Sequence, residues 1–150
     1  MIIDQRVTIT APADRVWAFV MDIPAVSRCV PGVEAFERLD DDTFEGALKV
    51  KVGPVTVRLQ GRIVVASRDH DTFASRLDIQ ASERRINSTV SATTTLTLIP
   101  VSAAATDLLV HTEASILGKL GEFGQSVMRR KADQIVAEFA RNAAVEVSRG

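Results

Sequence analysis

Side chains able to act as nucleophiles, acid–base catalysts or metal ligands are scarce in this sequence of 150 residues. It contains one cysteine, Cys29, and two histidines, His70 and His111, and it has no tyrosine. A metal site needs about three converging protein ligands, whereas the two histidines fall on different predicted elements. Cys29 precedes a Pro-Gly pair that ends a helix, and nothing in the sequence brings His111 beside it. The sequence therefore predicts no metal site, no catalytic residues and no cofactor.

Hydroxyl groups offer a second kind of chemistry. Ser88, Thr94 and Thr112 fall on the inward-facing positions of the late predicted strands. A hydroxyl can donate a hydrogen bond to a carbonyl of a bound ligand, although such groups more often satisfy nearby backbone or line the wet end of a pocket. Both roles stay open for these residues.

Glycines recur every three residues at Gly118, Gly121 and Gly124. A phosphate cradle is excluded, because there is no G-x-G-x-x-G pattern and no Gly-Lys-Ser/Thr follows. Each glycine inside a helix costs about 1 kcal/mol relative to alanine, so their presence requires a reason. One reason is a close approach of the helix to the sheet, and the other is an open portal beside Phe123.

Positive charge gathers at two places in the sequence. Lys49, Lys51, Arg58 and Arg62 share the outward side of two adjoining predicted strands, and Arg129-Arg130-Lys131 lies on the last predicted helix. Such rows are usually solvated faces. They can also dock an acidic partner surface or anionic lipid.

The elements that position these side chains begin with a strand. Residues 2–10 alternate between apolar and polar side chains, which predicts a half-buried strand. Pro12 suits the first turn of a helix. Pro24 interrupts the helical pattern, so we expect a second short helix to begin near Asp22 as its cap. The Pro-Gly pair at 31–32 ends that helix.

From Gly32 to about Leu117, apolar residues recur at every second position. Turn signals at residues 40–42, 53–54 and 69–72 divide this region into consecutive strands, which predicts an antiparallel meander. From Leu120 to Ala143 the apolar spacing changes to three and four residues, which predicts one amphipathic helix of about 26 residues. The whole chain, residues 1–150, is expected to form a single domain.

The predicted fold class is α+β, with a curved antiparallel sheet of about seven strands wrapped around the long C-terminal helix and two short helices after the first strand. The apolar residues expected to face the enclosed space are Phe44, Leu48, Val50, Leu59, Leu77, Ile79, Val90, Leu108, Val110, Phe123, Val127 and Met128. Any one of them is readily explained as core. As a set they could line a ligand cavity, because such pockets are mostly apolar. The aromatic content of 5% favours an interior that side chains leave partly unfilled.

Composition excludes several classes of protein. The 18 Lys+Arg residues balance 19 Asp+Glu residues, which argues against a nucleic-acid binder. A single cysteine cannot form an internal disulfide. No apolar run reaches the length of a membrane span, and the N-terminus lacks the layout of a signal peptide. We therefore expect a cytoplasmic protein whose contact with a membrane, if any, is peripheral and at its inner face.

Several sequence words resemble one known family. They are Ala11-Pro12, Val16-Trp17-Ala18-Phe19 with Asp22, Val30-Pro31-Gly32-Val33, Lys49-Val50-Lys51-Val52-Gly53-Pro54, and Gly118-Lys119-Leu120-Gly121-Glu122-Phe123-Gly124. Together they resemble the carbon monoxide dehydrogenase CoxG family, within the helix-grip superfamily (SRPBCC) of START domains, Bet v 1-type allergens and polyketide cyclases. The resemblance covers nearly the whole chain.

The resemblance implies a non-catalytic accessory protein for a molybdenum-containing carbon monoxide dehydrogenase or a related hydroxylase. It also implies binding of a hydrophobic small molecule, such as a quinone or a lipid, and membrane recruitment of the enzyme. Longer family members carry a C-terminal extension that can engage the membrane, whereas this sequence stops at Ser148-Arg149-Gly150. We therefore expect cavity binding rather than membrane tethering.

Two other functions remain open. The first is a small enzyme of the cyclase or dehydratase type, which would need a titratable side chain in the cavity; the residues to check are Asp78, His111 and Glu113. The second is a docking module whose interior is completely filled.

Overall fold

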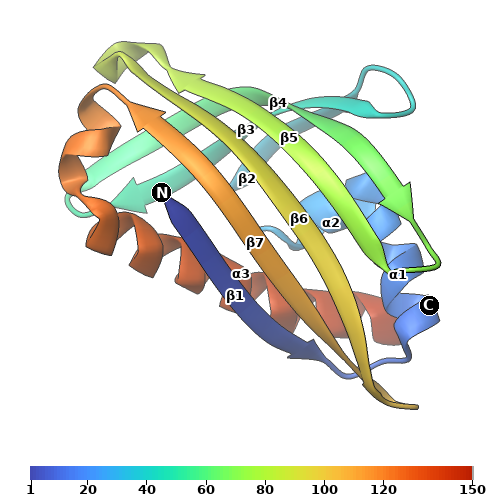
Figure 1. Cartoon of the computed structure of the whole chain (residues 1–150). Helices are drawn as coiled ribbons and strands as arrows, with labels where there is room; N and C mark the ends of the chain where they lie inside the picture. Colours follow the sequence, from blue (N-terminus) through green and yellow to red (C-terminus); the bar gives the residue numbers. More distant parts are fainter. Residues whose placement is uncertain (150) are drawn as a thin grey trace.

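The seven strands of this protein form one antiparallel sheet that curves around a long helix (Figure 1). The computed structural model describes residues 1–149. The elements in chain order are β1 (Ile2–Ile9), α1 (Ala13–Met21), α2 (Ile23–Cys29), β2 (Val33–Arg38), β3 (Thr43–Val52), β4 (Val55–Asp69), β5 (Ala74–Glu83), the 3-10 turn η1 (Arg84–Ile86), β6 (Ser88–Ser102), β7 (Ala105–Leu117), the 3-10 turn η2 (Lys119–Phe123) and α3 (Gln125–Arg149). The predicted fold class is confirmed.

Strand order in the sheet is β1-β7-β6-β5-β4-β3-β2, so the meander runs from β2 to β7 and the first strand closes onto the last. Arg6 and Thr8 of β1 both donate hydrogen bonds to the Asp107 carboxylate of β7, at 2.6 Å each. These polar contacts lie on the outer face, while Val7 and Ile9 between and beyond them join the core on the inner face. The first strand is thus held to the sheet from both faces.

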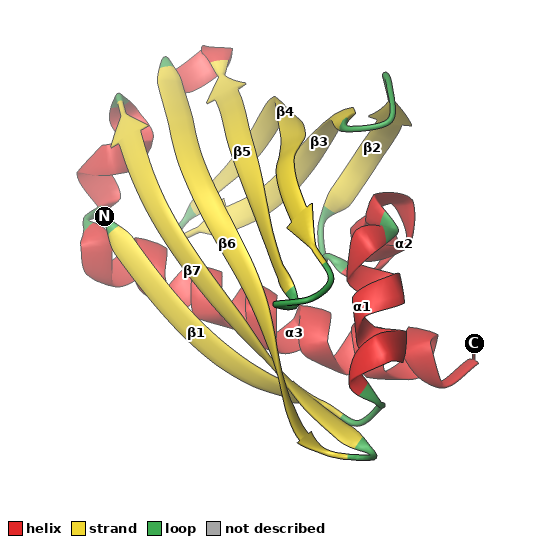
Figure 2. Cartoon of the chain, turned by 45° about the vertical axis from the view of Figure 1, so that its right-hand side comes forward, coloured by secondary structure: helices red, strands yellow, loops and turns green. Residues whose placement is uncertain are grey.

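The break between α1 and α2 falls where the sequence predicts it. The Asp22 side chain accepts a hydrogen bond from the Ala25 backbone N–H at 3.3 Å, which caps α2. Asn142 of α3 donates to the Cys29 carbonyl at 2.9 Å and joins the end of α2 to the long helix. Figure 2 shows both short helices beside the C-terminal part of α3, at one end of the sheet.

The entry to α3 differs from the prediction of one continuous helix from Leu120. The turn η2 comes first, and α3 begins only at Gln125, because Gly118 and Gly124 have φ of +84° and +88°. A Cβ on Gly118 would also lie 1.9 Å from the Asn87 carbonyl oxygen. The Ser88 hydroxyl accepts the Leu120 N–H at 2.8 Å and so fixes η2 on the end of β6. These glycines therefore serve a non-helical backbone and lie outside the helix interior.

Fully buried apolar residues gather mainly at the two ends of the space between sheet and helix. At the end near α1 and α2, the largest cluster joins Ile9, Val16 and Leu108 to Phe139 and Ala143. At the η2 end, Val52, Val57 and Leu120 form a second cluster. A third group, Ile23, Phe44 and Val65, packs under α2.

The corner from β5 to η1 depends on a buried carboxylate. The Glu83 side chain accepts hydrogen bonds from the Arg58 backbone N–H at 2.9 Å and from the Arg85 backbone N–H at 3.2 Å, and it pairs with the Arg85 guanidinium at 3.2 Å. The Arg85 side chain and the Arg58 N–H lower the pKa of Glu83 from its usual 4.5 to about 2. The carboxylate thus holds β4 against the start of η1.

We expect Glu83→Gln to lower the free energy of unfolding near neutral pH, because an amide cannot make the charge-assisted hydrogen bonds to Arg85. Since the folded-state pKa lies below the unfolded one, wild-type stabilisation is complete above about 4.5 and is lost as the pH falls towards about 2. Urea unfolding across this pH window should show the difference between wild type and variant shrinking. Glu138→Gln, on the exposed side of α3, is the matched control. A difference independent of pH would contradict this account.

The two glycines with positive φ give a second prediction. Gly124→Ala meets no atom within 4 Å, so it should lose only about 1–3 kcal/mol of stability from its backbone conformation. Gly118→Ala should lose clearly more, because it adds the clash with Asn87. Thermal unfolding of both variants checks the order, and equal losses would show that the close approach of η2 to the sheet has no energetic weight.

Candidate functional site

The apolar residues predicted to face the enclosed space do lie on the inner face of the sheet. Strand register places Leu48 opposite Leu59, and Leu77 opposite Thr94, so the inward positions form continuous rows across neighbouring strands. On the opposite side, Val50, Leu59, Val90, Phe123, Val127 and Met128 all pack against the η2-end cluster. The sheet residues and the start of α3 therefore face the same space.

Two of the predicted lining residues are completely enclosed by other side chains. Phe44 stacks on Phe36 and is 1% exposed, and Leu108 is also 1% exposed within the cluster near α1. The other ten remain partly exposed although they point inward: Leu48, Val50, Leu59, Leu77, Ile79, Val90, Val110, Phe123, Val127 and Met128. We refer to these ten residues as the inner apolar surface.

The long helix explains why this surface is only partly covered. Its buried residues are Phe139, Ala140, Ala143 and Val147, all in its C-terminal half. Its contacts with the sheet concentrate on β1, at one edge. Consequently the N-terminal half of α3, with Val127 and Met128, stands over the middle of the sheet without closing onto it.

Polar groups on the inner face mostly bond to each other. The hydroxyls of Thr94 and Thr112 lie 3.1 Å apart on neighbouring strands. Ser88 is occupied by the backbone of Ile86 and Leu120, which is the structural role considered from the sequence. The Thr94–Thr112 pair is thus the hydroxyl group that a ligand could reach beside the inner apolar surface.

Titratable side chains that an enzyme would need lie on the other face. His111 contacts the Asp4 carboxylate at 2.5 Å, and that hydrogen bond raises the pKa of His111. Asp78 pairs with Arg76, and Glu113 is exposed on the outer face of β7. Within residues 1–149, no three His, Cys, Asp or Glu side chains come together as a metal site.

The glycines considered as a portal lie around Phe123. Close approach holds for Gly118 and, more weakly, for Gly121, whose Cβ would lie 3.0 Å from the Ile116 carbonyl oxygen. Gly124 has open space around it. A portal at Gly118, Gly121 and Gly124 stays a prediction, with Gly124 as its most open position.

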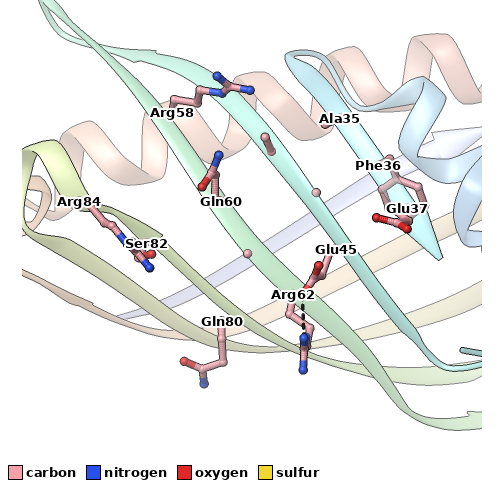
Figure 3. A pocket seen from close by; sticks show the side chains of 13 residues that line it. Ala35, Phe36, Glu37, Glu45, Arg58, Gln60, Arg62, Gln80, Ser82 and Arg84 are labelled. Carbon is pink, nitrogen blue, oxygen red and sulfur yellow. Dashed lines mark hydrogen bonds and ion pairs between the residues drawn. The ribbon is translucent and has the colours of Figure 1, made fainter. Parts of the chain in front are cut away.

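Two hollows lie on the outer face of the sheet. One has a volume of about 600 Å³ over β5, β6, β7 and β1. The other, of about 780 Å³, lies over β2 to β5 and includes Arg58 and Arg62, two of the exposed basic residues noted in the sequence (Figure 3). Its further members Gln60, Ser82 and Arg84 were not singled out from the sequence. Their outward parity was readable, but only the pairing register shows that they are neighbours.

Among the described residues, no helix combines the length and the apolar composition needed to cross a membrane. The curated proteins include no match to this chain. Solved structures do resemble it, as far as the fold is concerned.

A conserved protein from Geobacillus kaustophilus is similar over 99% of this chain and 96% of its own, with 19% identity and a TM-score of 0.89. The ZhuI aromatase/cyclase from Streptomyces sp. R1128 is similar over 99% and 94%, with 17% identity and a TM-score of 0.71. A START superfamily protein from Mycobacterium smegmatis is similar over 99% and 97%, with 11% identity and a TM-score of 0.69.

These similarities establish the helix-grip fold, which hosts both binding proteins and enzymes. The family is shown by a different comparison. The model of the carbon monoxide dehydrogenase CoxG family matches residues 6–148. Because that match spans almost the whole chain, the chain belongs to the CoxG family.

Proposed function

We propose that this protein binds a hydrophobic small molecule, quinone-like or lipid-like, between the inner apolar surface and the N-terminal half of α3. The observation that carries the proposal is the partial exposure of ten inward-facing apolar residues between closed ends. Apolar side chains that point into a fold and still reach solvent leave hydrophobic surface for a ligand to cover.

The size of the effect supports useful affinity. Covering about 200 Å² of apolar surface contributes about 5 kcal/mol at 25 cal/mol per Å², before the cost of immobilising the ligand. One hydroxyl of the Thr94–Thr112 pair can donate to a ligand carbonyl while the other accepts from it. This combination suits an apolar ring or chain that carries one or two oxygen atoms.

Binding without catalysis is the better-supported role. Acid–base catalysis requires a titratable group within hydrogen-bond reach of the substrate. Asp78, His111 and Glu113, the residues that would have favoured an enzyme, are engaged or exposed on the outer face. The aromatase/cyclase named among the similar structures shares the fold only.

Family membership supports the second part of the proposal, which is that the protein serves a carbon monoxide dehydrogenase-type molybdenum hydroxylase as an accessory component. A carrier of a hydrophobic redox molecule or lipid would complement an oxidoreductase, because the carrier shields the apolar ligand from water.

A pair of adjacent substitutions tests ligand binding. Ala114 points inward and is partly exposed, whereas Ser115 is exposed on the outer face. We expect Ala114→Phe to weaken binding of menadione or decanoate by about tenfold or more, which corresponds to about 1.4 kcal/mol, because the ring occupies the ligand's space. Ser115→Phe should bind like wild type. Calorimetric titration measures the affinities, and circular dichroism confirms that both variants fold.

Native mass spectrometry of the protein purified from its own host provides an independent measurement. A co-purifying quinone or lipid is the expected result. The proposal is overturned if wild type binds neither menadione nor decanoate, or if Ala114→Phe and Ser115→Phe bind them equally well.

A further inference from the structure

The larger outer hollow is a groove that crosses the strands, and short side chains form its floor. In the sheet register, Ala35 lies opposite Ala47, Ala47 opposite Gln60, and Gln60 opposite Ser82. Ala47 is only 6% exposed although it lies on the outer face. Longer side chains stand in the rows on either side of this floor, and together they enclose about 780 Å³.

One wall of the groove is basic. Lys49 lies directly opposite Arg58 in the register, and like charges in that position destabilise a sheet. The Glu83 carboxylate binds the Arg58 N–H, which brings Arg58 beside the start of η1, where Arg84 also lines the groove. Arg58 pairs with Glu34 at 3.0 Å, while Arg84 makes no ion pair with any residue of 1–149. This wall therefore holds more positive charge than the protein itself neutralises.

The other wall is different. Glu37 lies opposite Glu45, and Arg62 is bound to Glu45 at 2.6 Å (Figure 3). Two carboxylates thus share one cation on this side, so the groove has a basic wall and a mildly acidic one.

We propose that this groove binds an extended, acidic segment of a partner protein. Neighbouring strands lie about 4.8 Å apart, so the three cations of the basic wall span about 10 Å. In an extended segment, alternate side chains point to the same side about 6.7 Å apart. Acidic residues at alternate positions can therefore meet the basic wall, while the intervening side chains face Glu37 and Glu45.

Other occupants fit less well. Small-molecule pockets are mostly apolar and bury most of their ligand, whereas this groove is an open hollow lined largely by polar and charged side chains. An anionic bilayer would meet Glu37 and Glu45 as well as the cations. The groove and the inner apolar surface lie on opposite faces of the sheet, so this inference stands or falls separately from the proposed ligand.

Amide chemical shifts of the ¹⁵N-labelled protein test the inference directly. A capped peptide of three Glu-Ala repeats should shift the amides of Ala47, Gln60 and Ser82, and a Lys-Ala peptide should not. Arg84→Ala should weaken binding about three- to fivefold, and Arg58→Ala with Arg84→Ala about tenfold. Arg130→Ala removes an exposed cation from α3, outside the groove, and should leave binding unchanged.

Menadione binding, measured on the same variants, should match wild type. The inference is overturned if the acidic peptide shifts residues spread over the whole surface, if Arg130→Ala weakens binding as much as Arg84→Ala, or if phosphatidylserine vesicles bind through Arg58 and Arg84 while the peptide does not.

Discussion

The difference in width between one helix and a sheet of seven strands governs this structure. Seven strands about 4.8 Å apart make a sheet of roughly 30 Å, whereas a helix with its side chains is about 10–12 Å across. The single long helix α3 cannot cover the apolar face by itself, and its contacts concentrate on β1. Curvature of the sheet reduces the mismatch, and α1, α2 and η2 close the two ends where α3 alone would leave the core exposed.

The same mismatch separates the roles of the two faces. On the inner face, the central residues keep apolar surface that no other side chain covers, and the titratable groups considered for catalysis are absent from it. On the outer face, charged and polar side chains are free to form hollows between rows of unequal length. A protein built this way can hold an apolar molecule on one side of its sheet while it meets a charged partner on the other.

Periodicity in the sequence predicted the fold closely, because each strand has a consistent inward and outward side and the breaks at Asp22, Gly32 and Gly53 are strong local signals. It misplaced the start of the last helix, because the conformations of Gly118 and Gly124 depend on contacts with Asn87 and Ser88, distant in sequence. Parity identified inward residues but could not distinguish Phe44, which is enclosed, from Leu48, which is not. That distinction depends on where α2 and α3 come to lie.

The pairing of β1 with β7 has a consequence for biosynthesis. Arg6 and Asp107, which join these strands, are separated by 101 residues, and the Met1 amino group donates to the Ala114 carbonyl at 2.7 Å. The first strand to leave the ribosome therefore has no partner until nearly the whole chain has emerged. Such long-range pairing slows folding and leaves an unpaired edge exposed meanwhile. The alternating charges of Asp4 and Arg6 keep that waiting segment soluble.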